Sequence, residues 1–205
     1  MSYALPKSVV IGGRDFPIRY DYRVILDIFE AMNDPELTDQ ERALAVLQMF
    51  YMDFDAIEDY EAAIRECFWF INGGKYEESS RKKPRLVAWG QDFPYIAAPI
   101  NRVLGYEIRA VEYDPETNTG GLHWWTFLSA YMEIGDCLFA QVVGIRSKKA
   151  RGQKLDASER EFYRRNRDLV DIKARYTEAE EDLLKQWTGI QPGCPTRETA
   201  EENIF

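Results

Sequence analysis

The chain has 205 residues, 45% of them hydrophobic and 14% aromatic, which suits a packed core in one domain, with or without a small appendage, and argues against overall disorder. Its formal net charge of −9 argues against a general nucleic-acid-binding protein, because phosphate contacts need an excess of Lys and Arg, and suits a protein with a basic or amphipathic protein partner. No run reaches the roughly 18 apolar residues of a membrane span, and the N-terminus lacks an apolar signal core, so we expect a soluble protein that is not secreted.

The first predicted elements are a small β-hairpin and three helices. Two apolar, β-prone runs flank Gly12-Gly13, a pair that can adopt the positive φ of a tight turn. Apolar residues at helical spacing then predict a helix over residues 22–33. Thr38 and Glu41 form a capping box that opens a second helix, and a third is expected over about 57–71.

A polar and charged stretch separates these helices from the next ones. Residues 75–90 predict a linker. Asp92 is expected to cap the following helix, with Pro94 in its first turn, and Pro99 is expected to kink or shorten that helix. Residues 114–121 are rich in turn formers and predict a loop.

The next predicted helix lies in residues 121–131, a run that holds the single histidine and two adjacent tryptophans. The helix of this run should break near Gly135, and the next should extend to Gly144. A capping pattern then predicts a long charged helix over 156–175, followed by a short helix over 177–187.

Together these elements predict a mainly α protein of two helical halves with a small N-terminal β-hairpin. The C-terminal end is expected to be frayed, because Gly, Pro and polar residues gather there. The expected boundaries are a hairpin over 1–20, an N-terminal helical half over 21–74, a linker over 75–90, a C-terminal helical half over 91–187 and a flexible tail over 188–205.

The residues that common enzymes require are missing from the sequence. One histidine excludes metal sites with two or more His ligands, and neither a nucleophile elbow nor a phosphate-binding glycine loop is present. Carboxylate runs such as 180–182 are typical of solvated helix faces. We therefore expect no enzyme, no catalytic residue, no cofactor and no metal ion.

The three cysteines do not form a recognisable framework. They are odd in number and unevenly spaced, which argues against a zinc site or a set of disulfides. Cys67 and Cys137 lie in apolar stretches and are expected to be buried thiols, as in a reducing cytoplasm, whereas Cys194 lies near the end of the chain.

One basic segment could contact phosphate. Residues 146–154 and 164–167 concentrate Lys and Arg, but stacking bases would need aromatic neighbours and only Phe162 and Tyr163 are near. We interpret the segment as a joint between helices whose cations offset the surrounding acids, and expect no nucleic acid. Arg146 is expected to cap the carbonyl end of the preceding helix.

The tryptophan pair supplies the candidate partner-binding residues. Trp124 and Trp125 project about 100° apart on a helix, so one is expected in the core and the other nearer the surface. Leu128 and Tyr131 share the face of Trp124. These four residues either bind a partner or pack as core. His123, at the start of the helix, is expected to be a structural, capping histidine.

Four motifs are spread along the chain. They are the glycine hairpin with its step into the first helix (10–23), the W-F-I-N-G-G-K run (69–75), the L-H-W-W-T-F run (122–127) and G-I-R (144–146). Together they resemble the "gp fifteen" family of tailed-phage proteins over roughly residues 5–187. The stretch 84–105 departs from the usual sequence pattern of that family.

The resemblance implies a protein of tail morphogenesis, present in the host cell cytoplasm during infection. Family members look like tail assembly chaperones, which coat the long tape-measure protein before the tail tube forms around it. The implied partners are phage tail proteins, the tape-measure protein first, with possible self-association and no membrane. The alternative is a structural component of the virion, in the tail or the head–tail connector. A helical chaperone can bind an amphipathic helix through the apolar stripe of that helix.

Overall fold

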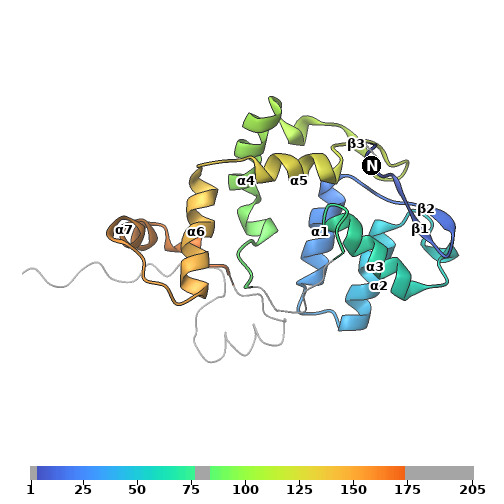
Figure 1. Cartoon of the computed structure of the whole chain (residues 1–205), viewed down its shortest axis with the longest axis horizontal. Coiled ribbons are helices and arrows are strands. Elements are labelled where there is room, and N and C mark those ends of the chain that lie inside the picture. The colour runs from blue at the N-terminus through green and yellow to red at the C-terminus, as the bar shows by residue number, and fades with distance from the viewer. Residues whose placement is uncertain (1–3, 77–83, 174–205) are drawn as a thin grey trace, which may run out of the picture. The chain divides into compact units, whose positions relative to one another are not determined.

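The computed structural model describes residues 4–76 and 84–173, and these are mainly α-helical with an antiparallel N-terminal hairpin, as predicted (Figure 1). The elements in chain order are β1 (Ser8–Ile11), β2 (Arg14–Pro17), α1 (Tyr22–Met32), α2 (Asp39–Phe50), the 3₁₀ turn η1 (Phe54–Ala56), α3 (Tyr60–Ile71), α4 (Trp89–Leu104), the 3₁₀ turn η2 (Ile108–Ala110), β3 (Tyr113–Asp114), β4 (Thr119–Gly120), α5 (Trp124–Met132), α6 (Leu138–Ala150), α7 (Ala157–Arg165) and α8 (Arg167–Val170).

The N-terminal hairpin forms as its sequence predicts. β1 pairs with β2 from Ser8 opposite Pro17 to Ile11 opposite Arg14, and the two turn glycines between them have φ values of 58° and 82°. One face of the ribbon is buried and β1 contacts α3. A two-stranded ribbon is marginal alone, so this packing is what holds it.

Local capping decides where the first helices begin. Asp21 accepts a hydrogen bond from the Arg23 amide and opens α1. At α2, Thr38 accepts from the Glu41 amide, while the Glu41 carboxylate accepts from the Thr38 amide, which confirms the predicted capping box. Asp59 caps α3, which therefore begins at Tyr60.

Removing the Thr38 hydroxyl gives a modest, local prediction. Thr38→Ala leaves an amide of the first turn of α2 without its side-chain acceptor and should lower the free energy of unfolding by about 1 kcal/mol. Urea denaturation followed by circular dichroism measures this loss. Thr38→Ser keeps the acceptor and is the control, and equal stability of the alanine and serine variants would contradict the prediction.

α4 differs from its predicted course. It begins at Trp89, so Asp92 lies one turn inside the helix, where its carboxylate accepts from the Ala88 amide. The helix also continues through Pro94 and Pro99 to Leu104, so Pro99 does not end it, and α4 stops just before Gly105. The carbonyls that lose a partner at these prolines belong to Gly90 and Tyr95. Both residues are exposed, so water can donate hydrogen bonds to those carbonyls.

The C-terminal helices are also divided differently from the prediction. α6 does not end at Gly144 but continues to Ala150. The predicted long helix over 156–175 is interrupted at Asn166, whose side-chain amide donates to the Phe162 carbonyl, a local bond that competes with helix propagation. The predicted short helix over 177–187, the tail over 188–205 and residues 77–83 of the linker lie outside the described residues.

The described core consists of a large cluster and a small one. The large cluster joins buried residues of the hairpin with residues of α1 to α5 and with Phe139 of α6. In it, α1 contacts α2, α4 and α5, and α4 contacts α5 and α6. The small cluster, Val142, Ile145 and Val170, lies between α6 and α8. In the described ranges, no helix combines the length and apolarity needed to cross a membrane.

Candidate functional site

His123 is a structural residue that opens α5, as predicted. Its Nδ1 accepts a hydrogen bond from the Trp125 amide at 3.0 Å, and its Nε2 lies 2.9 Å from the Pro6 carbonyl oxygen. The first contact requires an unprotonated Nδ1, so the proton of the neutral ring is on Nε2, where it can be donated to Pro6. The ring is 7% exposed and stacks on Tyr20.

The burial of this ring predicts a loss of stability in weak acid. Burial lowers the pKa of His123 below its ordinary value, so the unfolded chain binds the proton more readily than the folded one. The contribution of the neutral ring is therefore complete above about pH 6.5 and is lost as the pH falls from there toward the lowered folded pKa. Urea midpoints measured between pH 7.5 and pH 5 with a suitable buffer series detect this loss.

A histidine-free variant isolates this contribution. His123→Asn retains a capping side chain and removes the single imidazole of the chain, so its stability should fall less than that of the wild type over the same pH interval. Other groups titrate in both proteins, including Asp21, whose pKa is raised by burial. Parallel pH profiles for the two proteins would contradict the assignment.

The two tryptophans dock α5 onto the carboxyl end of α3. The Trp124 indole N–H donates to the Ile71 carbonyl and that of Trp125 to the Phe70 carbonyl, both at 2.8 Å. At Gly74, with φ of 84°, a Cβ atom would lie 2.9 Å from the Trp125 ring. The motifs at 69–75 and 122–127, far apart in the sequence, are therefore two sides of one contact.

The four predicted partner-binding residues differ in exposure. Trp124 is 1% exposed, whereas Trp125, Leu128 and Tyr131 are partly buried against the core. The expectation that one tryptophan anchors the core and the other lies nearer the surface is thus confirmed. Tyr131 packs against Trp89, with ring centroids 5.4 Å apart.

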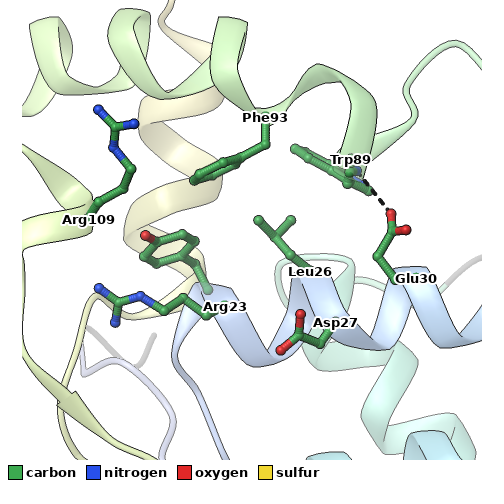
Figure 2. A pocket seen from close by; sticks show the side chains of 9 residues that line it. Arg23, Leu26, Asp27, Glu30, Trp89, Phe93 and Arg109 are labelled. Carbon is green, nitrogen blue, oxygen red and sulfur yellow. Dashed lines mark hydrogen bonds between the residues drawn. The ribbon is translucent and has the colours of Figure 1, made fainter.

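A pocket of about 350 Å³ opens between α1 and α4 (Figure 2). Leu26 projects from α1 toward Trp89 and Phe93 of α4, with Arg23 and Arg109 at one end of the view and Glu30 at the other. Pockets of this size that are mostly apolar, with a few polar groups, are typical binding sites. The lining residues are Tyr22, Arg23, Leu26, Asp27, Glu30, Trp89, Gly90, Phe93 and Arg109.

The aromatic wall of this pocket is supported from behind by α5. Trp89 packs edge-on against Trp124, with centroids 6.3 Å apart. Tyr22 stacks on Phe93 at 6.1 Å and on Phe127 at 4.9 Å. Because Trp124 and Phe127 are buried, the wall is held by the core and not by mobile surface side chains.

The two arginines of the pocket are already paired. Arg23 forms an ion pair with the buried Asp21 at 3.4 Å and donates to the Val111 carbonyl at 2.6 Å. Arg109 forms a two-pronged pair with Glu107 at 2.8 Å, and this pairing lowers the pKa of Glu107 to about 2. Both positive charges are therefore balanced by neighbouring carboxylates.

The carboxylates of the pocket differ in their partners. Glu30 accepts a hydrogen bond from the Gly90 amide at 3.0 Å, which joins α1 to the start of α4. Asp27 has neither a hydrogen bond nor an ion pair among residues 4–76 and 84–173. Desolvation by the surrounding atoms raises the pKa of Asp27 above its ordinary value. Asp27 is the lining carboxylate best placed to receive a ligand group.

Arg146 is an internal residue and does not cap the preceding helix, contrary to the prediction. It lies within α6, is 5% exposed and forms an ion pair with the buried Asp92 at 2.6 Å. Its guanidinium also donates to three carbonyls, those of Leu86, Leu169 and Val170. Because α4 and α8 both pack against α6, a side chain in the middle of α6 can reach both elements.

The rest of the basic segment is largely paired with acids. Lys148 pairs with Glu159, and Lys149 with Asp171. Arg164 and Arg165 both pair with Glu161. This supports the interpretation of the segment as a joint between helices. Within the described part of the chain, no group of three or more His, Cys, Asp or Glu side chains is placed to hold a metal ion.

The pocket is not among the features predicted from the sequence. Its lining comes from α1, from the start of α4 and from η2, which are separated by tens of residues. A signal was present in Trp89 and Phe93, which lie four residues apart and so share a helix face. The linker predicted over 75–90 includes Trp89, so this helix face is absent from the predicted elements.

Comparison with known proteins identifies the family. A family model described as "Bacteriophage Gp15 protein" matches residues 1–172, which include the hairpin, both docking motifs and every residue that lines the pocket. No curated protein and no solved structure matches the chain. A match over this much of a 205-residue chain shows that the protein belongs to the bacteriophage Gp15 family.

Proposed function

We propose that this phage protein is a non-enzymatic factor of tail morphogenesis, a chaperone that binds the tape-measure protein while the tail assembles. Family membership supports a phage protein, and the resemblance of its motifs favours the tail. The observation that carries a binding role is the open pocket between α1 and α4, whose wall presents Leu26, Trp89 and Phe93.

The pocket suits one side chain of an amphipathic helix. Helices bind in grooves through anchor residues at i, i+3, i+4 and i+7, and each anchor needs an apolar recess. A long helical partner offers such anchors repeatedly, so many copies of a weak binder can coat it and still be displaced. The net charge of −9 would keep such a coat from self-aggregating.

The tryptophan helix would serve the same function in two ways. Trp125 and Leu128, which are partly exposed, are proposed as further partner contacts. Trp124 and Tyr131 would act indirectly, because both pack on Trp89 of the pocket wall. Direct contact by Trp124 is unfavourable, since its side chain is 1% exposed.

Co-expression of the full chain with the tape-measure gene of the same phage tests this function. Soluble tape-measure protein should be recovered with the chain and should aggregate without it. Leu26→Gln, which makes the pocket wall polar at similar size, should reduce recovery severalfold. Leu44→Gln is the matched control, because Leu44 is exposed on α2 outside the pocket. Equal recovery with and without the chain would reject the proposal.

Mass spectrometry of purified phage particles separates the chaperone from the alternative role. A chaperone leaves the tail as the tube forms, so the particles should lack this chain. Its presence at a stoichiometry comparable to that of tail or connector proteins would instead establish a structural component of the virion and overturn the chaperone role.

A further inference from the structure

We propose that the pocket between α1 and α4 receives an arginine or lysine side chain of the partner protein, with its aliphatic stem against Leu26 and Trp89 and its charged head at Asp27. The inference rests on the proposed protein-binding role and names the side-chain chemistry that this role uses. It distinguishes a basic anchor from the purely apolar anchors that a hydrophobic groove usually takes.

The charges around the pocket favour a cation. Asp21 and Glu107 balance the two arginines of the lining, as their ion pairs show. Asp27 is left without a hydrogen bond or ion pair in the described part of the chain. An acidic side chain of a partner would be repelled by it. A purely apolar side chain would offer no partner to this exposed carboxylate, whereas a cation would pair with it.

The wall of the pocket favours a cation on an aliphatic stem. Lys and Arg bury their methylene chains along apolar surfaces and keep the charged end near water or an acid. The rings of Trp89 and Phe93, which are partly exposed, add faces on which a guanidinium or ammonium group is attracted. A volume of about 350 Å³ suits one such side chain better than a folded segment.

The charge of the whole chain acts in the same direction. With 35 acidic and 26 basic residues, the protein attracts basic surfaces of a partner over a distance and the pocket then selects one side chain. Arginine is expected to bind more tightly than lysine, because its planar group can stack on Trp89 while pairing with a carboxylate.

A titration with a small probe tests the pocket directly. Nα-acetyl-arginine methylamide is added to the full chain, and the indole N–H signal of Trp89 is followed by NMR after assignment with Trp89→Phe. The expected dissociation constant is on the order of 1–10 mM. Nα-acetyl-citrulline methylamide, nearly the same shape without the charge, should bind about fivefold or more weakly.

Two variants complete the test. Asp27→Asn should raise the dissociation constant of the arginine probe by about threefold to tenfold. Asp136→Asn is the matched control, because Asp136 is exposed and is not part of the pocket lining. Thermal melting establishes that both variants are folded.

Two results would overturn the inference. One is equal affinity for the arginine and citrulline probes together with unchanged binding by Asp27→Asn, which would show a pocket for neutral side chains. The other is no shift of the Trp89 signal up to about 50 mM probe. Failure of tape-measure recovery with normal arginine binding would reject only the proposed tail function, and the converse would reject only the basic anchor.

Discussion

Replacing Arg146 with methionine should lower the free energy of unfolding by about 3–5 kcal/mol, because it leaves a buried carboxylate without its partner. Asp92 is 0% exposed and lies 2.6 Å from the Arg146 guanidinium. The same change removes the donors to the carbonyls of Leu86, Leu169 and Val170. The free-energy cost of leaving these buried groups without hydrogen-bond partners exceeds the net stabilisation that the intact pair contributes.

A double-mutant cycle shows whether the effect belongs to the pair. Asp92→Asn keeps an acceptor for the Ala88 amide but leaves the Arg146 charge uncompensated, so it should also destabilise the protein strongly. The combined variant should lose clearly less stability than the two single changes added together. Urea denaturation of the full chain gives all four values. Additive losses, or a loss below about 1 kcal/mol for Arg146→Met, would contradict a structural role for the pair.

The features predicted well from the sequence are those decided within one turn of chain. The capping box of Thr38 and Glu41 needs only residues three apart, and it forms as predicted. His123 follows two glycines at the start of an apolar helix and caps it, again a local arrangement. The hairpin at Gly12-Gly13 depends on turn residues and flanking apolar runs, both visible in the sequence.

The features that were missed depend on contacts between distant segments. Arg146 and Asp92 are 54 residues apart, and nothing in either neighbourhood indicates that α6 packs across α4. The pocket needs α1 beside the start of α4, and the polar stretch before Trp89 suggested a linker there instead. Pro99 is tolerated in α4 although the local rule disfavours it, since the carbonyl four residues earlier belongs to the exposed Tyr95.

Trp124→Ala should lower the free energy of unfolding by about 3–5 kcal/mol, since it empties a fully buried site in the large core. It also removes the indole N–H that pairs with the Ile71 carbonyl at the end of α3. Trp125→Ala loses an equivalent hydrogen bond, to Phe70, but from a partly exposed ring, and should cost clearly less. Urea denaturation compares the two, and equal losses would contradict the placement of Trp124 as the inner ring.

Trp124→Phe separates packing from pocket support. It retains most of the buried ring and loses the hydrogen bond to Ile71, so the expected loss of stability is about 1–2 kcal/mol and the protein remains folded. Because Trp124 packs edge-on against Trp89, the smaller ring should loosen the pocket wall and weaken the arginine probe, although residue 124 does not line the pocket. Trp125→Phe, matched in chemistry, leaves that wall intact and should bind the probe normally. Unchanged probe binding by Trp124→Phe would show that the tryptophan helix stabilises the core without supporting the binding site.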